Sequence, residues 1–483
     1  MDITIVGLGP GDAEDLTRRA WHTLTTASHL YLRTAQHGCV PGLPKALRYR
    51  SFDALYETHE RFEDVYQAII DALMAAAREG DLVYAVPGDP LVGEATTTGL
   101  LKEARAEGIA IEIVSGVSFV EPLLAQLGVD ALDGLQLLDG LQVAAMHHPP
   151  INPAFPALLA QVYSTAVASD IKLTLMNQYP EDFELQLVHN AGRADVQVET
   201  LPLYALDRSE GIGAMTALYL PALGEHSSFE SAQEIIAHLR SPEGCPWDRE
   251  QTHESLRRFL IEEAWEVLEA IEEGDAAALA EELGDLLLQI VLHAQIATEE
   301  GRFRMADVLQ HINDKMIRRH PHVWGDVDVQ GDPEAVLHNW EELKRAEKAA
   351  VGKDDGYLLD SLPRGMPALL EALRLQERAA KVNFDWPHVA QVLDKLREEL
   401  EELQEAQTDA EREQELGDLL FTLVNLARWM KLEPEGALRG ANARFRRRFR
   451  HVEEGARDSG RPLIEHSLAQ LDALWNEAKQ AGL

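Results

Sequence analysis

The N-terminal half of the chain alternates short apolar runs with longer amphipathic stretches. The runs "ITIVGLG" (3–9), "LVYAVPGDP" (82–90), "IEIVSG" (111–116), "IKLTLMNQY" (171–179) and "TALYLPAL" (216–223) are typical of buried strands. By contrast, "DVYQAIIDALMAAAREG" (64–80) has helical periodicity and ends at a glycine. This alternation predicts an α/β domain over residues 1–222.

Beyond residue 222 the strand pattern disappears. Apolar residues recur with helical spacing, interrupted at "RSPEGCPWD", "HPHVWGD", "VGKDDGY" and "NFDWPH". We therefore predict an all-α region of two parts, residues 223–351 and 357–483, joined by a Gly/Asp-rich link at 352–356.

The helical region contains an internal repeat. The block "LIEEAWEVLEA" (260–270) matches "LREELEELQEA" (396–406), and "EELGDLLLQI" (281–290) matches "QELGDLLFTL" (414–423). A further pair follows in the same order, "NDKMIRR" (313–319) and "NARFRRR" (442–448). Matched blocks in the same order with similar gaps indicate a duplicated helical unit.

Each predicted helix pair carries an apolar stripe flanked by acids. At about 100° per residue, the expected core stripes comprise Leu256, Leu260, Ala264, Val267 and Ile271, and then, after a turn at Gly274 and Asp275, Leu279, Leu283, Leu286, Leu287 and Ile290. The flanking arcs hold Glu262, Glu263, Glu266, Glu282 and Asp285, and in the second repeat Glu398, Glu399, Glu402, Glu415 and Asp418. In an antiparallel pair of helices, the two acidic arcs can converge.

Three interpretations fit such arcs. Two carboxylates about 4 Å apart repel by roughly 4 kcal/mol at an effective dielectric of about 20, and a hard cation such as Mg²⁺ or Mn²⁺ removes that penalty. A solvated acidic face is the second interpretation. The presence of the same acidic arcs in both repeats argues against it. A di-iron bundle is the third, but it requires paired Glu-x-x-His motifs, and Glu250 to His253 is a single one that precedes the helix.

Composition narrows the class of protein. The chain has 483 residues and a formal net charge of −38, which argues against a nucleic-acid binder because such binders neutralise phosphates with cations. The start "MDITIVGLGP" lacks the basic residues of a signal peptide, and no apolar run is long enough for a membrane helix. The two cysteines, Cys39 and Cys245, lie far apart, so we expect a cytoplasmic protein without a disulfide framework.

The block "CPWDREQTHESL" followed by EExxE and ExxD motifs resembles the MazG family of all-α nucleoside triphosphate pyrophosphohydrolases. The resemblance covers residues 228–480. It implies that NTP and water are converted to NMP and diphosphate, with Mg²⁺ (or Mn²⁺) bound by the ten acids of the arcs. Glu263 and Glu399 are expected to be the catalytic carboxylates among them.

The basic strips of the repeats are candidates for phosphate contacts, because Arg suits bidentate contacts to phosphate. We expect Asn313, Lys315, Arg318, Asn442, Arg444 and Arg447 to contact the nucleotide, together with Lys381. Trp247 and Trp386 are candidates for stacking on a base, although an aromatic residue just before a helix also serves as a packing anchor. Surface charge is the alternative interpretation of the strips.

In the N-terminal half, "GLGPGD" (7–12), "VPGDP" (86–90) and "SGVSF" (115–119) each follow a predicted strand. With the terminal "LYLPAL", they resemble the tetrapyrrole (corrin/porphyrin) methylase family over residues 1–222. This resemblance implies S-adenosylmethionine bound between two α/β lobes, at Pro10, Gly88, Asp89, Val92, Ser118 and Phe119. The order of the two units resembles that of the YabN-type methylase–pyrophosphohydrolase fusions.

We therefore expect a Mg²⁺-dependent NTP pyrophosphohydrolase with an S-adenosylmethionine-binding domain, forming a homodimer and binding neither nucleic acid nor membrane. The alternative is an S-adenosylmethionine-dependent methyltransferase whose helical half serves dimerisation or regulation, and a non-catalytic assembly role is third. "MHHPP" (146–150) and "HPHVWGD" (320–326) lack partners at metal-ligand spacing, so their histidines are expected to lie in loops.

Overall fold

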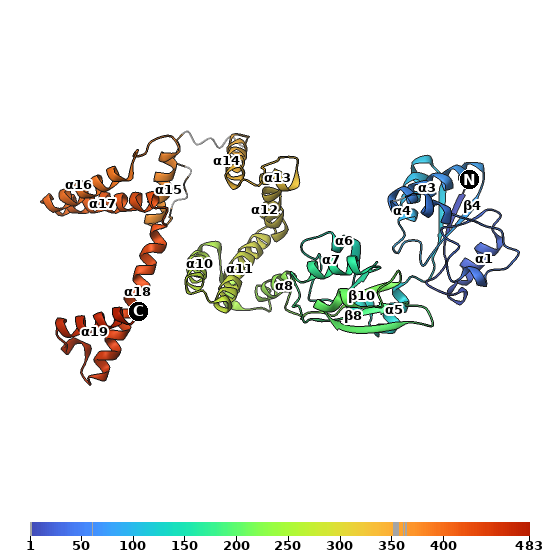
Figure 1. The fold of residues 1–483 in the computed structure, drawn as a ribbon, viewed down its shortest axis with the longest axis horizontal. Helices are drawn as coiled ribbons and strands as arrows, with labels where there is room; N and C mark the ends of the chain where they lie inside the picture. The colour runs from blue at the N-terminus through green and yellow to red at the C-terminus, as the bar shows by residue number, and fades with distance from the viewer. Residues whose placement is uncertain (1, 60, 351–356, 361, 363–364) are drawn as a thin grey trace. The chain divides into compact units, whose positions relative to one another are not determined.

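The computed structural model describes residues 2–59, 61–350, 357–360, 362 and 365–483. The chain forms two compact units, Met1–Ile312 and Asn313–Leu483, whose elements are traced in Figure 1. The predicted link at 352–356 lies outside the described residues, and the predicted domain limits remain predictions.

The first lobe of the N-terminal domain is a parallel sheet in the order β3-β2-β4-β1-β5. Its strands are β1 (Asp2–Gly7), β2 (Leu30–Leu32), β3 (Arg50–Ser51), β4 (Leu82–Val86) and β5 (Ala110–Val114). The connecting helices are α1 (Arg18–Thr26), α2 (Asp53–Thr58), α3 (Phe62–Glu79) and α4 (Ala95–Glu107). Alternate strand residues such as Ile3 and Tyr84 pack in one core with the apolar face of α3. The residues between them, such as Val6 and Ala85, pack in a second core that includes Leu24 of α1. Both faces of the sheet are therefore buried, which is why its strands read as near-continuous apolar runs.

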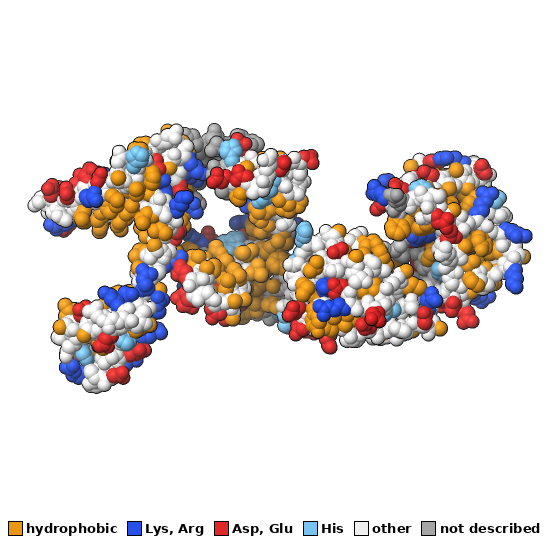
Figure 2. Space-filling model, viewed as in Figure 1, with side chains coloured by type: hydrophobic (Ala, Val, Ile, Leu, Met, Phe, Trp, Pro, Cys, Tyr) orange, Lys and Arg blue, Asp and Glu red, His pale blue; other side chains and the backbone are white. Residues whose placement is uncertain are grey.

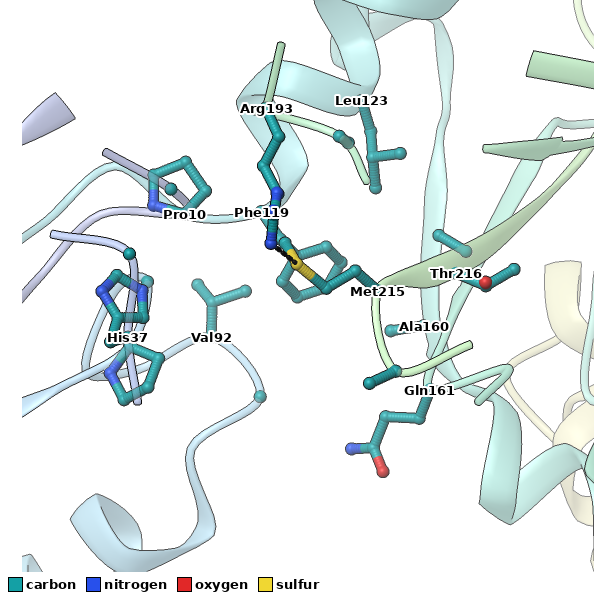
Figure 3. Close-up of a pocket in the computed structure, with 18 of the residues that line it drawn as sticks. Pro10, His37, Val92, Phe119, Leu123, Ala160, Gln161, Arg193, Met215 and Thr216 are labelled. Carbon is teal, nitrogen blue, oxygen red and sulfur yellow. Dashed lines mark hydrogen bonds between the residues drawn. The ribbon is translucent and has the colours of Figure 1, made fainter. Parts of the chain in front are cut away.

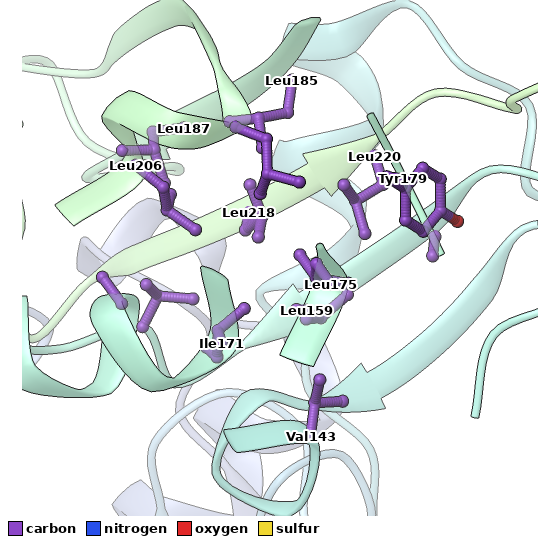
Figure 4. Close-up of a cluster of buried hydrophobic side chains, with 14 of the residues drawn as sticks. Val143, Leu159, Ile171, Leu175, Tyr179, Leu185, Leu187, Leu206, Leu218 and Leu220 are labelled. Atoms are coloured by element: carbon purple, nitrogen blue, oxygen red, sulfur yellow. The ribbon is translucent and has the colours of Figure 1, made fainter. Parts of the chain in front are cut away.

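The second lobe has a mixed sheet in the order β6-β7-β10-β8-β9. Its elements are α5 (Val120–Leu127), β6 (Gln136–Asp139), α6 (Gly140–Ala144), β7 (Ala157–Ala160), α7 (Thr165–Leu175), β8 (Glu184–His189), β9 (Gln197–Pro202) and β10 (Thr216–Leu220). Figure 4 shows Ile171 and Leu175 of α7 packed with Leu159 and Leu218 of the sheet.

One predicted strand is wrong. The run "IKLTLMNQY" (171–179) forms the C-terminal part of α7 and the turn after it. Ser164 caps this helix by accepting a hydrogen bond from the Val167 backbone N–H. A short apolar run buried on all sides has no periodicity that separates a helix from a strand, so the upstream cap is the informative signal.

After Leu220 the described residues contain helices and no strand, as predicted. The first unit continues with α8 (Phe229–Leu239), α9 (Pro246–Glu250), α10 (His253–Glu273) and α11 (Ala276–Glu299). Helix α12 (Met305–Arg319) crosses into the second unit, followed by α13 (Pro321–Trp324), α14 (Pro333–Ala350), α15 (Ala368–Ala380), α16 (Val389–Glu405), α17 (Asp409–Trp429), α18 (Pro434–Asp458) and α19 (Leu468–Gln480). The two repeats therefore correspond to the helix pairs α10–α11 and α16–α17.

The prediction that the stripe residues are buried is largely wrong. Leu256 is buried, and Val267, Leu279 and Leu286 are half-buried. The other members of the two stripes are exposed: Leu260, Ala264, Ile271, Leu283, Leu287 and Ile290. Gln289, which by helical spacing shares the flanking arc of Glu282 and Asp285, is buried. Periodicity identifies an apolar face and does not specify what covers it. Within this chain, α8 packs against α11, and the apolar core of the first repeat gathers at that end of the pair.

Candidate functional site

In the first repeat, a tight turn brings two acidic helix faces together. Gly274 adopts a left-handed φ of 70°, and the Asp275 carboxylate caps α11 by accepting hydrogen bonds from the Ala277 and Ala278 N–H groups. Helix α11 then runs back along α10. One carboxylate oxygen from each of Glu263, Glu266 and Glu282 lies within 4.8 Å of the others.

This proximity changes the ionisation of the acids. Burial raises the pKa of Glu263, and the charges of Asp285, Glu266 and Glu262 raise it further. The pKa of Glu282 is raised for the same reasons, chiefly by desolvation and then by Glu266 and Asp285. Asp285 and Glu262 thus add negative charge around the three acids. Such a cluster favours a cation.

The second repeat reproduces this geometry with Glu399, Glu402 and Glu415, which again offer oxygens within 4.8 Å of one another. Desolvation raises the pKa of Glu415, and Glu402, Asp418 and Glu399 contribute. Glu399 is only 4% exposed, and its Oε2 is buried without a hydrogen-bond partner among the described residues. Glu398, at the start of the motif, is exposed.

Lys395 is a residue of this cluster that the sequence reasoning missed. Its Nζ lies 2.8 Å from Glu398 Oε1 and 2.8 Å from Glu399 Oε1. The signal was present in the sequence, because a lysine three and four residues before two glutamates lies on their face of a helix.

In the N-terminal domain, three glycine-containing loops converge beyond the carboxyl ends of β1, β4 and β5. Gly9 and Gly88 exchange backbone hydrogen bonds of 3.2 and 2.8 Å. A side chain at Gly7 or Gly116 would place its Cβ 2.5 or 2.4 Å from the Gly88 carbonyl oxygen. Only glycine permits this approach, so the loops predicted from "GLGPGD", "VPGDP" and "SGVSF" form one structure.

These loops border a cavity of about 820 Å³ between the two lobes of the domain. Four predicted cofactor residues line it: Pro10, Gly88, Val92 and Phe119. Figure 3 shows Pro10 and Val92 of the first lobe facing Gln161 and Thr216 of the second. The volume is in the range of sites for cofactor-sized molecules.

Asp89 and Ser118, both described, lie outside the lining of this cavity. The Asp89 carboxylate accepts hydrogen bonds from the Leu91 N–H (2.9 Å) and the Gly116 N–H (3.1 Å), which tie two of the loops together. The Ser118 hydroxyl donates to Glu121 and accepts from the Val120 N–H. Both side chains therefore shape the loops, and their contact with a cofactor stays a prediction.

The cavity also has a polar wall that the sequence did not reveal. Arg33, which lines it, forms an ion pair with the buried Glu94 and donates to the Tyr56 hydroxyl at 2.9 Å. Glu94 in turn accepts hydrogen bonds from the N–H and hydroxyl of Thr96 at the start of α4. The pair neutralises both charges inside the lobe.

Comparison with known proteins agrees with this division of the chain. The family model of tetrapyrrole (corrin/porphyrin) methylases matches residues 2–207, and that of the MazG nucleotide pyrophosphohydrolase domain matches residues 251–324. The protein YabN of Bacillus subtilis (strain 168) is 44% identical over 492 residues, covering 99% of this chain and 98% of the relative. The chain belongs to the YabN family.

The helical half of this YabN-family chain also has relatives of its own. A protein of Thermotoga maritima named nucleoside triphosphate pyrophosphohydrolase/pyrophosphatase MazG is 47% identical over 251 residues, 52% of this chain and 95% of the relative. The nucleoside triphosphate pyrophosphohydrolase of Escherichia coli (strain K12) is 43% identical over 252 residues, 51% of this chain and 95% of the relative. Alignments of 251 and 252 residues are longer than one repeat, so the similarity to these relatives extends over both repeats.

The predicted nucleotide contacts of this YabN-family chain lie mostly at the surface. Arg318 Nε donates to Glu347 Oε1 of α14 at 2.7 Å, so this guanidinium has a protein partner. The Trp247 ring meets Phe259 edge-on with ring centroids 6.2 Å apart. Of the other predicted nucleotide contacts, Lys315 is half-buried. The rest are exposed: Asn313, Lys381, Trp386, Asn442, Arg444 and Arg447. Their nucleotide roles stay predictions.

The histidine motifs differ in part from expectation. His147 and His148 lie in an exposed loop, as predicted, whereas His322 of "HPHVWGD" lies in the short helix α13. Pro321 at its first turn is a position where proline starts a helix readily. Neither motif belongs to a group of potential metal ligands among the described residues.

Proposed function

We propose that the helical half is a Mg²⁺-dependent nucleoside triphosphate pyrophosphohydrolase that splits NTP into NMP and diphosphate. The observation that carries this proposal is the pair of carboxylate clusters, Glu263–Glu266–Glu282 and Glu399–Glu402–Glu415, each on two adjacent helices. The family match of residues 251–324 and the names of the Thermotoga and Escherichia coli relatives support the same reaction.

The residues present fit a hard divalent cation. Every donor in the two clusters is a carboxylate oxygen, the ligand type that Mg²⁺ and Mn²⁺ prefer over softer donors. Desolvation and, after it, the neighbouring acids raise the pKa values of Glu263, Glu282 and Glu415. Glu399 Oε2 is buried without a hydrogen-bond partner among the described residues. The three acids of each cluster would hold the ion, with Asp285, Asp418, Glu262 and Glu398 beside them.

The bound ion would offset negative charge on the phosphate oxygens. The chain's own carboxylates then position the attacking water. Glu263 and Glu399 are the members best suited to accept its proton, because each is less exposed than the acid one turn further along its helix. The exposed cations of α18, among them Arg444 and Arg447, are suited to hold the remaining phosphates.

We propose that the cavity of the N-terminal domain binds S-adenosylmethionine. Its location at the carboxyl ends of parallel strands, its volume of about 820 Å³ and its lining by Pro10, Gly88, Val92 and Phe119 support this. The bound cofactor would supply an electrophilic methyl group. Methyltransferase activity, with the helical half as a regulatory module, is the second candidate function, and the cavity is the observation that favours it.

We further propose that the protein is a homodimer. The exposed apolar residues Leu260, Ile261, Leu283, Leu287 and Ile290 lie on α10 and α11, and α16 and α17 carry a similar set. Figure 2 shows hydrophobic side chains gathered along α16 and α17. Apolar faces of this extent mark protein contacts, and a second copy supplies a matching face. Light scattering that gives the mass of a monomer at micromolar concentration would contradict this.

Neither nucleic acid nor membrane is a proposed partner. The net charge of −38 opposes phosphate backbones, and no helix among the described residues has both the length and the apolar character to cross a bilayer. Cys39 and Cys245 are free thiols, which supports our placement of the protein in a reducing cytoplasm.

The deciding experiment is a panel of nucleoside triphosphates incubated with the full chain and Mg²⁺, with diphosphate and phosphate release measured separately. We expect diphosphate release that persists with Mn²⁺ and stops in excess chelator. Equal hydrolysis in chelator refutes the metal assignment. Silence with all nucleotides, together with S-adenosylmethionine binding in calorimetry, favours the methyltransferase instead.

A further inference from the structure

The two repeats differ at one position beside their acid clusters. Alignment of residues 260–270 with 396–406 makes Phe259 the counterpart of Lys395. Phe259 packs against the apolar core of the first repeat. Lys395 instead places its ammonium 2.8 Å from Glu398 Oε1 and 2.8 Å from Glu399 Oε1. The same helical position therefore serves packing in one repeat and charge in the other.

The clusters consequently differ in their counter-ions. Among the described residues, Glu263, Glu266 and Glu282 form no ion pair with a cationic side chain. The neighbours that shift the pKa values of Glu263 and Glu282 are all acids. In the second cluster Lys395 opposes the acids, since its charge lowers the pKa of Glu415 while Glu402 and Asp418 raise it. The second cluster is thus partly neutralised before any metal arrives.

At Glu399, the Lys395 ammonium and a divalent cation would compete for the same carboxylate. The Glu399 side chain is 6% exposed; Oε1 holds the Lys395 ammonium, and Oε2 is buried without a hydrogen-bond partner among the described residues. A divalent cation that uses Glu399 must enter beside a positive charge or displace it. Like charges in a region partly shielded from solvent repel more strongly than in water.

We propose that Lys395 is a built-in counter-ion that competes with the divalent cation, so that the second repeat binds metal more weakly than the first. This inference rests on the proposed function of the clusters. It implies that the first repeat is loaded at low metal concentration and the second only at higher concentration. Diphosphate release should therefore rise in two phases as Mg²⁺ is added.

The test measures Mn²⁺ binding by the full chain without nucleotide, from the electron paramagnetic resonance signal of the free ion. The parent carries Glu263→Gln and Glu266→Gln, so that only the second repeat binds. Adding Lys395→Met should tighten Mn²⁺ binding about tenfold, equivalent to roughly 1.4 kcal/mol. Arg397→Met is the matched control, because Arg397 lies on the same helix but pairs with Asp394 outside the cluster; it should leave the affinity unchanged.

The reverse change gives an independent arm. In a parent carrying Glu399→Gln and Glu402→Gln, Phe259→Lys places an ammonium three and four residues before Glu262 and Glu263, and should weaken Mn²⁺ binding about tenfold. Unchanged or weaker binding by Lys395→Met overturns this inference alone, because it shows that the lysine organises the site instead of competing. No Mn²⁺ binding by either parent or by the unmodified chain overturns the metal assignment and the inference with it.

Discussion

Replacing Gly116 by alanine should damage the N-terminal domain in both stability and cofactor binding. The added Cβ would lie 2.4 Å from the Gly88 carbonyl oxygen and 2.9 Å from Gly7 Cα, and both atoms belong to backbone. No flexible side chain can give way, so the loops themselves must separate. Overpacking of this kind costs about 1–3 kcal/mol. Each 1 kcal/mol lowers the melting temperature of a domain of this size by about 2–4 °C.

The same movement displaces Gly88, which lines the cavity. We therefore expect Gly116→Ala to lower the melting temperature by about 5 °C and to weaken S-adenosylmethionine binding in calorimetry. Gly80→Ala is the control, since Gly80 has an extended backbone and a Cβ there meets nothing within 4 Å. If Gly116→Ala matches the control in both measurements, the convergence of the three loops is not what shapes the cavity.

Three further predictions concern acidic side chains. At saturating Mg²⁺, where both repeats are loaded, Glu263→Ala/Glu266→Ala and Glu399→Ala/Glu402→Ala double variants should each lose several orders of magnitude in diphosphate release at the altered repeat. Because the second repeat has the richer basic strip, with Arg444, Arg446, Arg447 and Arg448, its loss should cost at least as much as loss of the first. The opposite ranking contradicts the role of the strip. Asp89→Ala frees the Leu91 and Gly116 N–H groups and should destabilise the domain by about 1–3 kcal/mol; weaker cofactor binding at unchanged stability would instead assign Asp89 a direct contact. Hydrogen bonds from Arg319 and Arg318 lower the pKa of Glu347 from 4.5 to about 2. The stabilising contribution of Glu347 is therefore complete above pH 4.5 and is lost as the pH falls through about 2. In urea denaturation, Glu347→Gln should be less stable than the unmodified chain at pH 7, and the difference should be gone near pH 2. A difference that does not depend on pH refutes the assignment.

Local pattern predicted the strands that lead into the glycine loops and the helix pairs that carry the acids, and it did not predict β2, β3 or the strands β6 to β9. The strands β1, β4 and β5 were evident because each is an apolar run that leads into a glycine-containing loop, and β10 because it is a short apolar run. The turn at Gly274 was evident because glycine readily adopts the left-handed conformation that ends a helix. The duplicated acids were recognisable as candidate ligands because helical spacing alone places Glu263 and Glu266 on one face.

What the sequence missed depends on tertiary contacts. The segment 171–179 is helical because α7 is capped at Ser164, outside the apolar run itself. The stripe residues Leu260 and Leu283 are exposed because packing within the chain uses another part of the helix pair. Arg33 and Glu94 are 61 residues apart and meet only in the folded lobe, so no spacing rule identifies them.

Each acid cluster is made within one helical hairpin, and this has a consequence for how the chain folds. The acids that meet are close in sequence, Glu263 with Glu282 and Glu399 with Glu415. Contacts between such near neighbours form early, since closing a short loop takes far less time than assembling distant segments. The repulsion between the acids therefore arises while the hairpin is still alone, before the rest of the unit can compensate for it. We therefore expect the folding rate of the helical half to depend on which cations are present in solution while the hairpins form.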